Sequence, residues 1–273
     1  MPDLKGKVAI ITGASAGVGE STAKHFASLG CGVALTGRNT ANLERVAQAC
    51  CAEGLHRDKV LVVPGDLTVE KDVAEVVQKT AKHFGKIDIL VNSAAIPVVG
   101  SIQGASMEDF NRVWETNFIG PLCMIKNAVP YLRQTKGSIV NISTVSSLTA
   151  VQTTVPYSVA KAALDHLTRC AALENAPYGV RANTINPGVI KTLMMLKPGV
   201  SVEQHMEHLE KATSSVHPLG RVATPEEIAR CIAFLASDDA SFITGVTMPV
   251  DGGVLLTSSV SGPAPSAAAK KAP

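Results

Sequence analysis

The segment TGASAGVG, residues Thr12–Gly19, decides the fold of this 273-residue chain. A short apolar run, KVAIIT, comes directly before it, and GVGESTAKHFASLG follows with the pattern of a helix. A strand, a glycine-rich turn and a helix in this order let the backbone approach a phosphate group closely at the helix N-terminus. The segment therefore predicts a dinucleotide site, with contacts expected from Gly13, Ser15, Gly17, Val18 and Gly19.

The same alternation of apolar runs and helical patterns continues along the chain. Strands are expected at residues 7–12, 32–37, 59–66, 87–94, 137–144, 180–188 and 244–253, and helices at 17–30, 39–54, 69–84, 107–134, 157–177 and 225–237. Alternating strands and helices indicate parallel strands with right-handed crossovers, and uniformly apolar strands indicate helices on both faces. We expect one doubly wound α/β domain with a seven-stranded parallel sheet over residues 1–256. Residues 257–273 are small, polar and proline-containing, which predicts a disordered tail.

Composition excludes several other classes of protein. A net charge of +2 argues against nucleic-acid binding. The sequence contains no run of about 18 apolar residues, so no membrane span is predicted. The N-terminal apolar run is too short for a signal peptide. The six cysteines form no CxxC pair, which indicates reduced thiols in the cytoplasm. His205 and His208 alone are a weak metal pattern, so no metal is expected.

The end of the second expected strand discriminates between two cofactors. An acidic residue there would bind the ribose 2′-hydroxyl of NAD(H) and repel the 2′-phosphate of NADP(H). This chain has TGRN instead, with Gly37 and Arg38 and no acidic residue. A planar guanidinium can pair with a phosphate group. The pattern favours NADP(H) over NAD(H).

The stretch YSVAK places Tyr157 and Lys161 four residues apart. On a helix this spacing puts both side chains on one face, one turn apart. A nearby cation lowers the pKa of a phenol, and a phenol tuned in this way could exchange a proton with an alcohol or a carbonyl compound. The same spacing also occurs between unrelated residues on the surface of ordinary helices.

Taken together, these motifs resemble the short-chain dehydrogenase/reductase family over about residues 5–254. TGASAGVG is similar to the family's TGxxxGxG, and YSVAK to its YxxxK. The segments GDLT, NPGVIKT and VDGG follow in the family's order. The overall pattern resembles the 3-oxoacyl-carrier-protein-reductase-like members, including animal ones. The resemblance implies a Rossmann-type fold and an NADP(H)-dependent oxidoreductase that interconverts an alcohol and a ketone or aldehyde.

The resemblance also implies individual roles. Tyr157 would be the acid/base, Lys161 would tune it and hold the cofactor ribose, and Asn117 would hold a water that links the lysine to solvent. The catalytic set is Asn117, Thr144, Tyr157 and Lys161. Further cofactor contacts would be Asp66 (at the adenine), Leu67, Asn92, Ala94, Tyr157, Lys161, Pro187, Gly188, Ile190 and Thr192. The substrate would meet Thr144, Tyr157, Met194 and Met195.

Two positions depart from the family pattern. Thr144 stands where a serine is usual, thirteen residues before Tyr157. Alternation along the strand favours Thr144 as the hydroxyl of the catalytic set and places Ser143 on the opposite face. Ser146, in the following loop, could take this role in place of Thr144. In NSAA, Ala95 replaces a glycine beside the cofactor.

Two functions and one assembly are expected. The first function is a reductase or dehydrogenase of small to medium, apolar carbonyl or alcohol substrates. The alternative is a catalytically weak, dinucleotide-binding regulatory or scaffold protein of the same fold. Family members usually pair through the helices near 107–134 and 157–177 and the last strand, so a homotetramer or homodimer is expected. Leu164, Leu167, Ala171 and Leu173 would supply surplus apolar surface. Met194 and Met195, with Leu193 and Leu196, would form an apolar wall over the substrate or pack as ordinary core.

Overall fold

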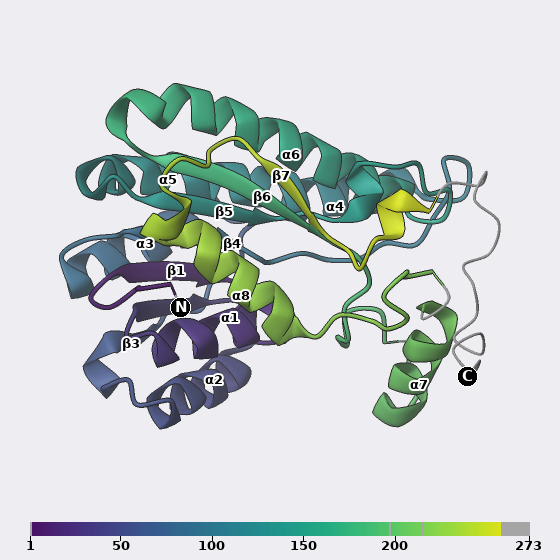
Figure 1. The fold of residues 1–273 in the computed structure, drawn as a ribbon, viewed down its shortest axis with the longest axis horizontal. Coiled ribbons are helices and arrows are strands. Elements are labelled where there is room, and N and C mark those ends of the chain that lie inside the picture. The colour runs from purple at the N-terminus through teal and green to yellow at the C-terminus, as the bar shows by residue number, and fades with distance from the viewer. Residues whose placement is uncertain (1, 197, 214–215, 258–273) are drawn as a thin grey trace, which may run out of the picture.

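A computed structural model describes residues 2–196, 198–213 and 216–257 (Figure 1). Its strands form a single parallel sheet in the order β3-β2-β1-β4-β5-β6-β7. The strands are β1 (Val8–Thr12), β2 (Gly32–Thr36), β3 (Val60–Val62), β4 (Ile89–Asn92), β5 (Ser138–Ile142), β6 (Arg181–Pro187) and β7 (Thr247–Val250). The predicted doubly wound, seven-stranded domain is confirmed. The expected tail, residues 257–273, lies outside the described residues except for Thr257.

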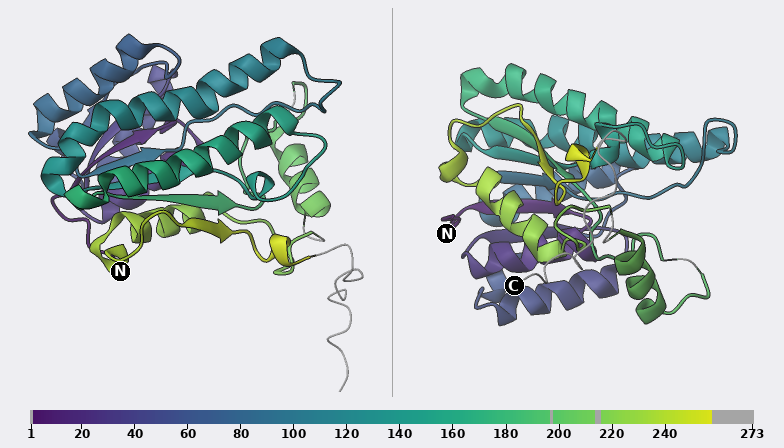
Figure 2. Two further views of the ribbon diagram at one scale, coloured as in Figure 1. Left: turned by 90° about the horizontal axis from the view of Figure 1, so that it is seen from above. Right: turned by 45° about the vertical axis from the view of Figure 1, so that its right-hand side comes forward.

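Helices cover both faces of this sheet (Figures 1 and 2). Within β1, Ala9 and Ile11 pack into one apolar cluster with Phe26, whereas Ile10 packs into another with Met124. Successive side chains of a strand point to opposite faces, so each face is buried separately. One layer holds α1 (Gly17–Ser28), α2 (Thr40–Ala52) and α8 (Pro225–Ala236), and the other holds α3 (Glu70–Phe84), α5 (Gly120–Thr135) and α6 (Val155–Asn175).

The strand order reverses between β1 and β4. From β1 the chain winds outward through β2 and β3, then returns to pair β4 with the other edge of β1. The hydroxyl Oγ1 of Thr12, at the end of β1, accepts hydrogen bonds from the backbone N–H groups of Ser93 (3.0 Å) and Ala94 (3.1 Å). Ligands of open α/β sheets bind at such a reversal, beyond the carboxyl ends of the strands.

Two segments differ from the predicted elements. The helix expected over 107–134 is divided into α4 (Met107–Trp114), a π-helical turn (Glu115–Ile119) and α5. Pro121 has no N–H to donate four residues back, which disfavours a continuous α-helix there. In addition, α7 (Val202–Thr213) is a helix that was not predicted, and His205 is its one buried residue. Such a sparse apolar pattern gives little signal in the sequence.

The apolar surplus expected on α6 is largely absent. Leu164 and Ala171 are buried within the chain, Leu167 packs against the same core, and Leu173 is exposed. The expectation that these four residues supply surplus apolar surface is therefore wrong for Leu164 and Ala171, which are buried within the chain. Among the helices of the described residues, none is long and apolar enough to cross a membrane.

Candidate active site

The glycine-rich loop is packed backbone against backbone. A Cβ on Gly19 would lie 2.3 Å from the carbonyl oxygen of Gly13, and one on Gly13 would lie 2.8 Å from the Cα of Ala94. Gly13 also has a φ of +66°, which side chains rarely allow. The glycines are therefore required by the contact between this loop and the segment after β4.

The N-terminus of α1 has no side-chain cap. Its N-cap residue is Ala16, whose methyl side chain cannot accept a hydrogen bond from the first turn. By contrast, side chains of Asn39, Ser106 and Thr224 cap α2, α4 and α8. Uncapped N–H groups with the positive end of the helix dipole favour an anion. The loop and helix therefore fit the pyrophosphate of a dinucleotide.

The end of β2 lies beside this loop. A Cβ on Gly37 would meet the hydroxyl of Ser15 at 3.5 Å. The next residue, Arg38, is exposed. Asp66 accepts hydrogen bonds from the N–H (2.9 Å) and hydroxyl (2.8 Å) of Thr68. The pKa of Asp66 is lowered chiefly by the Thr68 N–H and further by the Thr68 hydroxyl and the charge of Arg38. Arg38 and Asp66 therefore share one rim.

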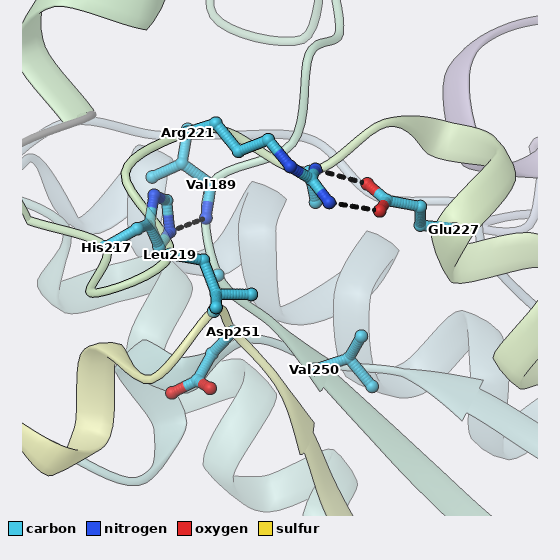
Figure 3. A pocket seen from close by; sticks show the side chains of 10 residues that line it. Val189, His217, Leu219, Arg221, Glu227, Val250 and Asp251 are labelled. Atoms are coloured by element: carbon cyan, nitrogen blue, oxygen red, sulfur yellow. Dashed lines mark hydrogen bonds and ion pairs between the residues drawn. The ribbon is translucent and has the colours of Figure 1, made fainter.

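The segment after β6 closes over the loop from the other side. A Cβ on Gly17 would meet the methyl group of Thr192 at 3.5 Å. The backbone N–H of Val189 donates to Nε2 of His217 at 3.2 Å (Figure 3). Next to it, Ile190 pairs with Ala223. Gly188 leaves no room for a Cβ, which would lie 2.7 Å from the same His217 nitrogen. These contacts hold residues 187–192 as one edge of the crevice.

The same contacts surround a small cavity of about 100 Å³ under this segment. Arg221 and Glu227 form an ion pair at 2.7 Å on its rim (Figure 3). His205 of α7 lies at 3.0 Å from the carbonyl oxygen of Thr192 through its Nε2. His205 and His217 therefore have structural partners here. Within the described ranges, no three His, Cys, Asp or Glu residues lie together as a metal site would require.

Tyr157 and Lys161 lie on the first turns of α6. Lys161 is buried, and its Nζ donates to the carbonyl oxygen of Ile142, the last residue of β5, at 2.6 Å. The same Nζ lies 5.8 Å from the centre of the Tyr157 ring. Burial lowers the pKa of Lys161 from 10.5 to about 8, and the charge of Asp165 opposes this lowering.

The pKa of Tyr157 runs against the expectation from its neighbour. Burial raises it to about 12, and desolvation is the cause. The predicted lowering of the phenol pKa is therefore not what this structure has. At neutral pH Tyr157 is a neutral phenol, which can donate a proton.

The three candidate hydroxyls next to β5 are now distinguished. Ser143 is buried, and its hydroxyl donates to the carbonyl oxygen of Lys161 at 3.2 Å, beneath α6. Thr144 and Ser146 are half-buried, and their hydroxyls lie 3.2 Å apart. The N–H of Ser146 donates to the Thr144 hydroxyl at 3.2 Å, so that oxygen is oriented while its proton can still be donated. Ser143 is thus separated from the Thr144–Ser146 pair.

Asn117 lies in the π-helical turn and is fully buried. Its side chain accepts from the N–H of Ile96 and donates to the carbonyl oxygen of Ile96, both at 2.9 Å. Each end of the amide therefore has one backbone partner. The backbone carbonyl of Asn117 faces a different situation, because Pro121, four residues on, has no N–H. The water that Asn117 was expected to hold stays a prediction.

Other predicted residues support the crevice from behind. Asn92 donates to Asn141 at 2.8 Å, and Asn141 donates to Thr168 of α6 at 2.8 Å. Leu67 packs against Gly120, where a Cβ would lie 2.9 Å from the Leu67 Cβ. Leu193, Met194 and Met195 are 49%, 43% and 42% exposed, so they are not ordinary core. Their contact with a substrate stays a prediction.

Sequence reasoning missed three polar residues of the site. Ser147, Asp165 and Asn186 are joined to one another under the Thr144 loop. A signal for Asp165 was present, because it follows Lys161 by four residues and so shares its helix face. Asn186 was included in a family segment without a role of its own.

The fold and the site define a class: a doubly wound oxidoreductase domain with a dinucleotide crevice. A family model described as enoyl-(acyl carrier protein) reductase matches residues 13–255. The chain is 37% identical over 247 residues to meso-2,3-butanediol dehydrogenase of Serratia marcescens, covering 90% of this chain and 94% of that protein. It is 35% identical to a 3-oxoacyl-[acyl-carrier-protein] reductase of Thermotoga maritima, covering 93% and 99%.

A solved structure gives the same result. A short-chain dehydrogenase/reductase from Caenorhabditis elegans, determined with its cofactor, superposes with a TM-score of 0.88 at 33% identity, covering 95% of this chain and 98% of that one. The chain belongs to the short-chain dehydrogenase/reductase family. The family resemblance stated from the motifs is confirmed.

Proposed function

We propose that the protein is an NADP(H)-dependent oxidoreductase that interconverts a secondary alcohol and a ketone, with Tyr157 as the acid/base. The observation that carries the proposal is the buried Lys161 one turn from Tyr157, held on the end of β5 beside Thr144. Burying a lysine costs free energy, because its charge loses contact with water. Buried titratable groups are therefore more common at functional sites than on ordinary helices. An ordinary surface helix would not bury it.

The cofactor, when bound, supplies or accepts the hydride. The protein's own groups handle the oxygen of the substrate. As a neutral phenol, Tyr157 donates its proton to a carbonyl oxygen on which negative charge develops, and the Thr144 hydroxyl donates a hydrogen bond to the same oxygen. Lys161 holds positive charge behind Tyr157, which stabilises the phenolate left after the transfer.

Preference for NADP(H) rests on Arg38. Two arginines approach the glycine-rich loop, and they differ in what they bind. Arg45 is engaged with both carboxylate oxygens of Glu20, at 2.6 and 2.8 Å. Arg38 is exposed, and within the described residues it forms no ion pair. An exposed guanidinium beside Gly37 is available to a 2′-phosphate.

The substrate is proposed to be small to medium and apolar. Leu193, Met194 and Met195 expose apolar surface on the segment after β6. Flexible methionine side chains suit varied apolar ligands. Among the relatives, meso-2,3-butanediol dehydrogenase and trans-4-hydroxycyclohexanecarboxylate dehydrogenase of Sinomonas cyclohexanicum, 34% identical, are named for secondary alcohols.

The test is NADPH oxidation with a panel of ketones and diketones, for the native chain and for Tyr157→Phe. We expect Tyr157→Phe to lose about 10²-fold or more in kcat, because the proton donor is removed. Its affinity for NADPH, measured by fluorescence titration, should stay nearly native. Retention of more than about a tenth of the native rate would rule out Tyr157 as the acid/base. A native chain that binds NADPH but reduces nothing on the panel would favour the scaffold alternative.

The protein is further proposed to act in the cytoplasm as a homodimer or homotetramer. Its six cysteines are all unpaired, which suits a reducing compartment. Leu173 is 81% exposed and Phe242 fully so, and large exposed apolar side chains are common at subunit contacts. Light scattering that gave a monomer of 28.4 kDa at micromolar concentration would contradict this assembly.

A further inference from the structure

Asp165 is a buried carboxylate without a role in the mechanism above. It is 3% exposed, and its Oδ2 accepts hydrogen bonds from Ser147 (2.6 Å) and Asn186 (3.0 Å). Its Oδ1 is buried and finds no partner among the residues that the structure describes. Burying a carboxylate away from water is costly unless its charge is compensated. Its position in the site therefore needs a reason.

One connection runs from Asp165 to the backbone of Thr144. The hydroxyl of Ser147 lies 2.6 Å from the Thr144 carbonyl oxygen, and the amide of Asn186 donates to the same oxygen at 3.0 Å. Asn186 also donates to the Ser147 hydroxyl at 2.9 Å. A hydroxyl has one proton, so Ser147 donates to Thr144 or to Asp165 at any moment. Both bridging side chains end on the Asp165 carboxylate.

A second connection runs along α6 to Lys161. Asp165 follows Lys161 by four residues, on the same helix face. The other groups around Lys161 are uncharged: Tyr157 on its own helix, the Ile142 carbonyl of β5, and Ser143, whose hydroxyl bonds the Lys161 carbonyl. The charge of Asp165 opposes the lowering of the Lys161 pKa by burial. Among the described residues, Asp165 is the carboxylate whose charge changes the pKa of Lys161.

We propose that Asp165 is a positioning residue of the active site, which fixes the Thr144 loop through Ser147 and Asn186 and acts as the counter-charge of Lys161. The proposal rests on the proposed function for the roles of Thr144 and Lys161. It assigns one carboxylate to two tasks that a purely structural residue would not combine. Asp165 does not touch the reacting atoms and acts through its neighbours.

The first test compares Asp165→Asn with Ser147→Ala in the pH profile of kcat/KM. Asparagine keeps the size and one acceptor oxygen but removes the charge, so Lys161 should lose its proton at a lower pH. We expect kcat to fall about tenfold and the alkaline limb to move down by about one pH unit. Ser147→Ala breaks one link to Thr144 and keeps the charge. It should lower kcat and leave the limb in place.

A second readout does not need turnover. The pKa of Lys161 is about 8 in the folded chain and 10.5 ordinarily. Between these values the unfolded chain binds one more proton, so this group makes stability rise with pH in that window. Lys161→Met should remove the rise, and the difference in Tm between the native and Lys161→Met chains isolates it. With Asp165→Asn the rise should start at a lower pH.

Each outcome decides the proposal. The proposal is overturned if Asp165→Asn leaves both the alkaline limb of the pH profile and the rise in Tm at their native pH. It is also overturned if Ser147→Ala shifts the alkaline limb. Adding Asp165→Asn to Lys161→Met should produce no shift in the window. Should Asp165→Asn fail to fold, Asp165→Glu keeps the charge and must keep the native limb while lowering kcat. If the native chain reduces no ketone, the proposed function fails, while the Tm measurement still decides the coupling.

Discussion

The two sides of the crevice are built in opposite ways. On the side of β1 and β2, the site consists of missing side chains: Gly13 and Gly19 are in backbone contact, and the N-terminus of α1 is uncapped. On the side of β5 and α6, it consists of buried polar side chains such as Lys161 and Asp165. The first side is sensitive to added atoms and the second to removed hydrogen-bonding or charged groups. The difference teaches which kind of substitution reports on which step.

The largest effect is expected on the polar side, at Thr144. Thr144→Val keeps the shape and removes the hydroxyl, so kcat should fall about 10²–10³-fold. Thr144→Ser keeps the donor and should retain most of the activity. Ser143→Ala is the matched control, because that hydroxyl bonds the Lys161 carbonyl beneath the helix. Steady-state kinetics on one good ketone measure all three.

A normal rate for Thr144→Val beside an inactive Ser146→Ala would reverse this assignment. The two hydroxyls lie 3.2 Å apart, so the structure makes this a direct competition. The comparison between the two sides would survive that result, since the loss would still follow removal of a hydrogen-bonding group.

The next effect is expected on the glycine side. Gly19→Ala places a Cβ 2.3 Å from the Gly13 carbonyl, so the loop must shift. We expect a loss of about 1–3 kcal/mol in the free energy of unfolding and weaker cofactor binding, because an added methylene has no space. Gly37→Ala is the control, with its Cβ at an ordinary 3.5 Å from Ser15. Denaturant unfolding measures the stability of both variants. Equal stability of Gly19→Ala and Gly37→Ala would contradict the view that this side of the crevice is sensitive to added atoms.

The smallest effect is expected at the exposed rim. Arg38→Ala should weaken NADPH by about tenfold in KM and leave NADH nearly unchanged, since an exposed ion pair is screened by water. Arg38→Asp should reverse the preference by adding repulsion to the lost pairing. Arg57→Ala, another exposed arginine, paired with Glu44, is the control. Equal kcat/KM for NADPH and NADH in the native protein would contradict the proposed role of Arg38 in binding the 2′-phosphate.

The glycine side was largely readable from the sequence, whereas the polar side was readable only in part. In Thr12–Gly19 the glycines stand between an apolar run and a helical pattern, so the sequence itself predicts a turn between a strand and a helix. Tyr157 and Lys161 are marked by their spacing. The partners of Asp165 come from η3 (Val145–Ser147) and β6, and no local pattern predicts that Ser147 and Asn186 meet there.

Desolvation is another quantity that spacing does not contain. The interval from Tyr157 to Lys161 predicted a lowered phenol pKa, yet burial raises it. How much water a packed helix excludes depends on the elements around it, which are distant in sequence. The π-helical turn at Asn117 was missed although Pro121 is a local signal for it, and α7 was missed because its single buried residue, His205, gives almost no periodic signal.

The strand order has a consequence for how the chain is made. Within this sheet β1 is synthesised before the other strands yet becomes central, and β2 pairs with one of its edges soon after. Its other edge must wait until Ile89–Asn92 has been synthesised. Until then that edge presents unpaired N–H and carbonyl groups, which other chains can bind. The nascent chain therefore carries an open strand edge in its centre while β1, β2 and β3 exist and β4 does not.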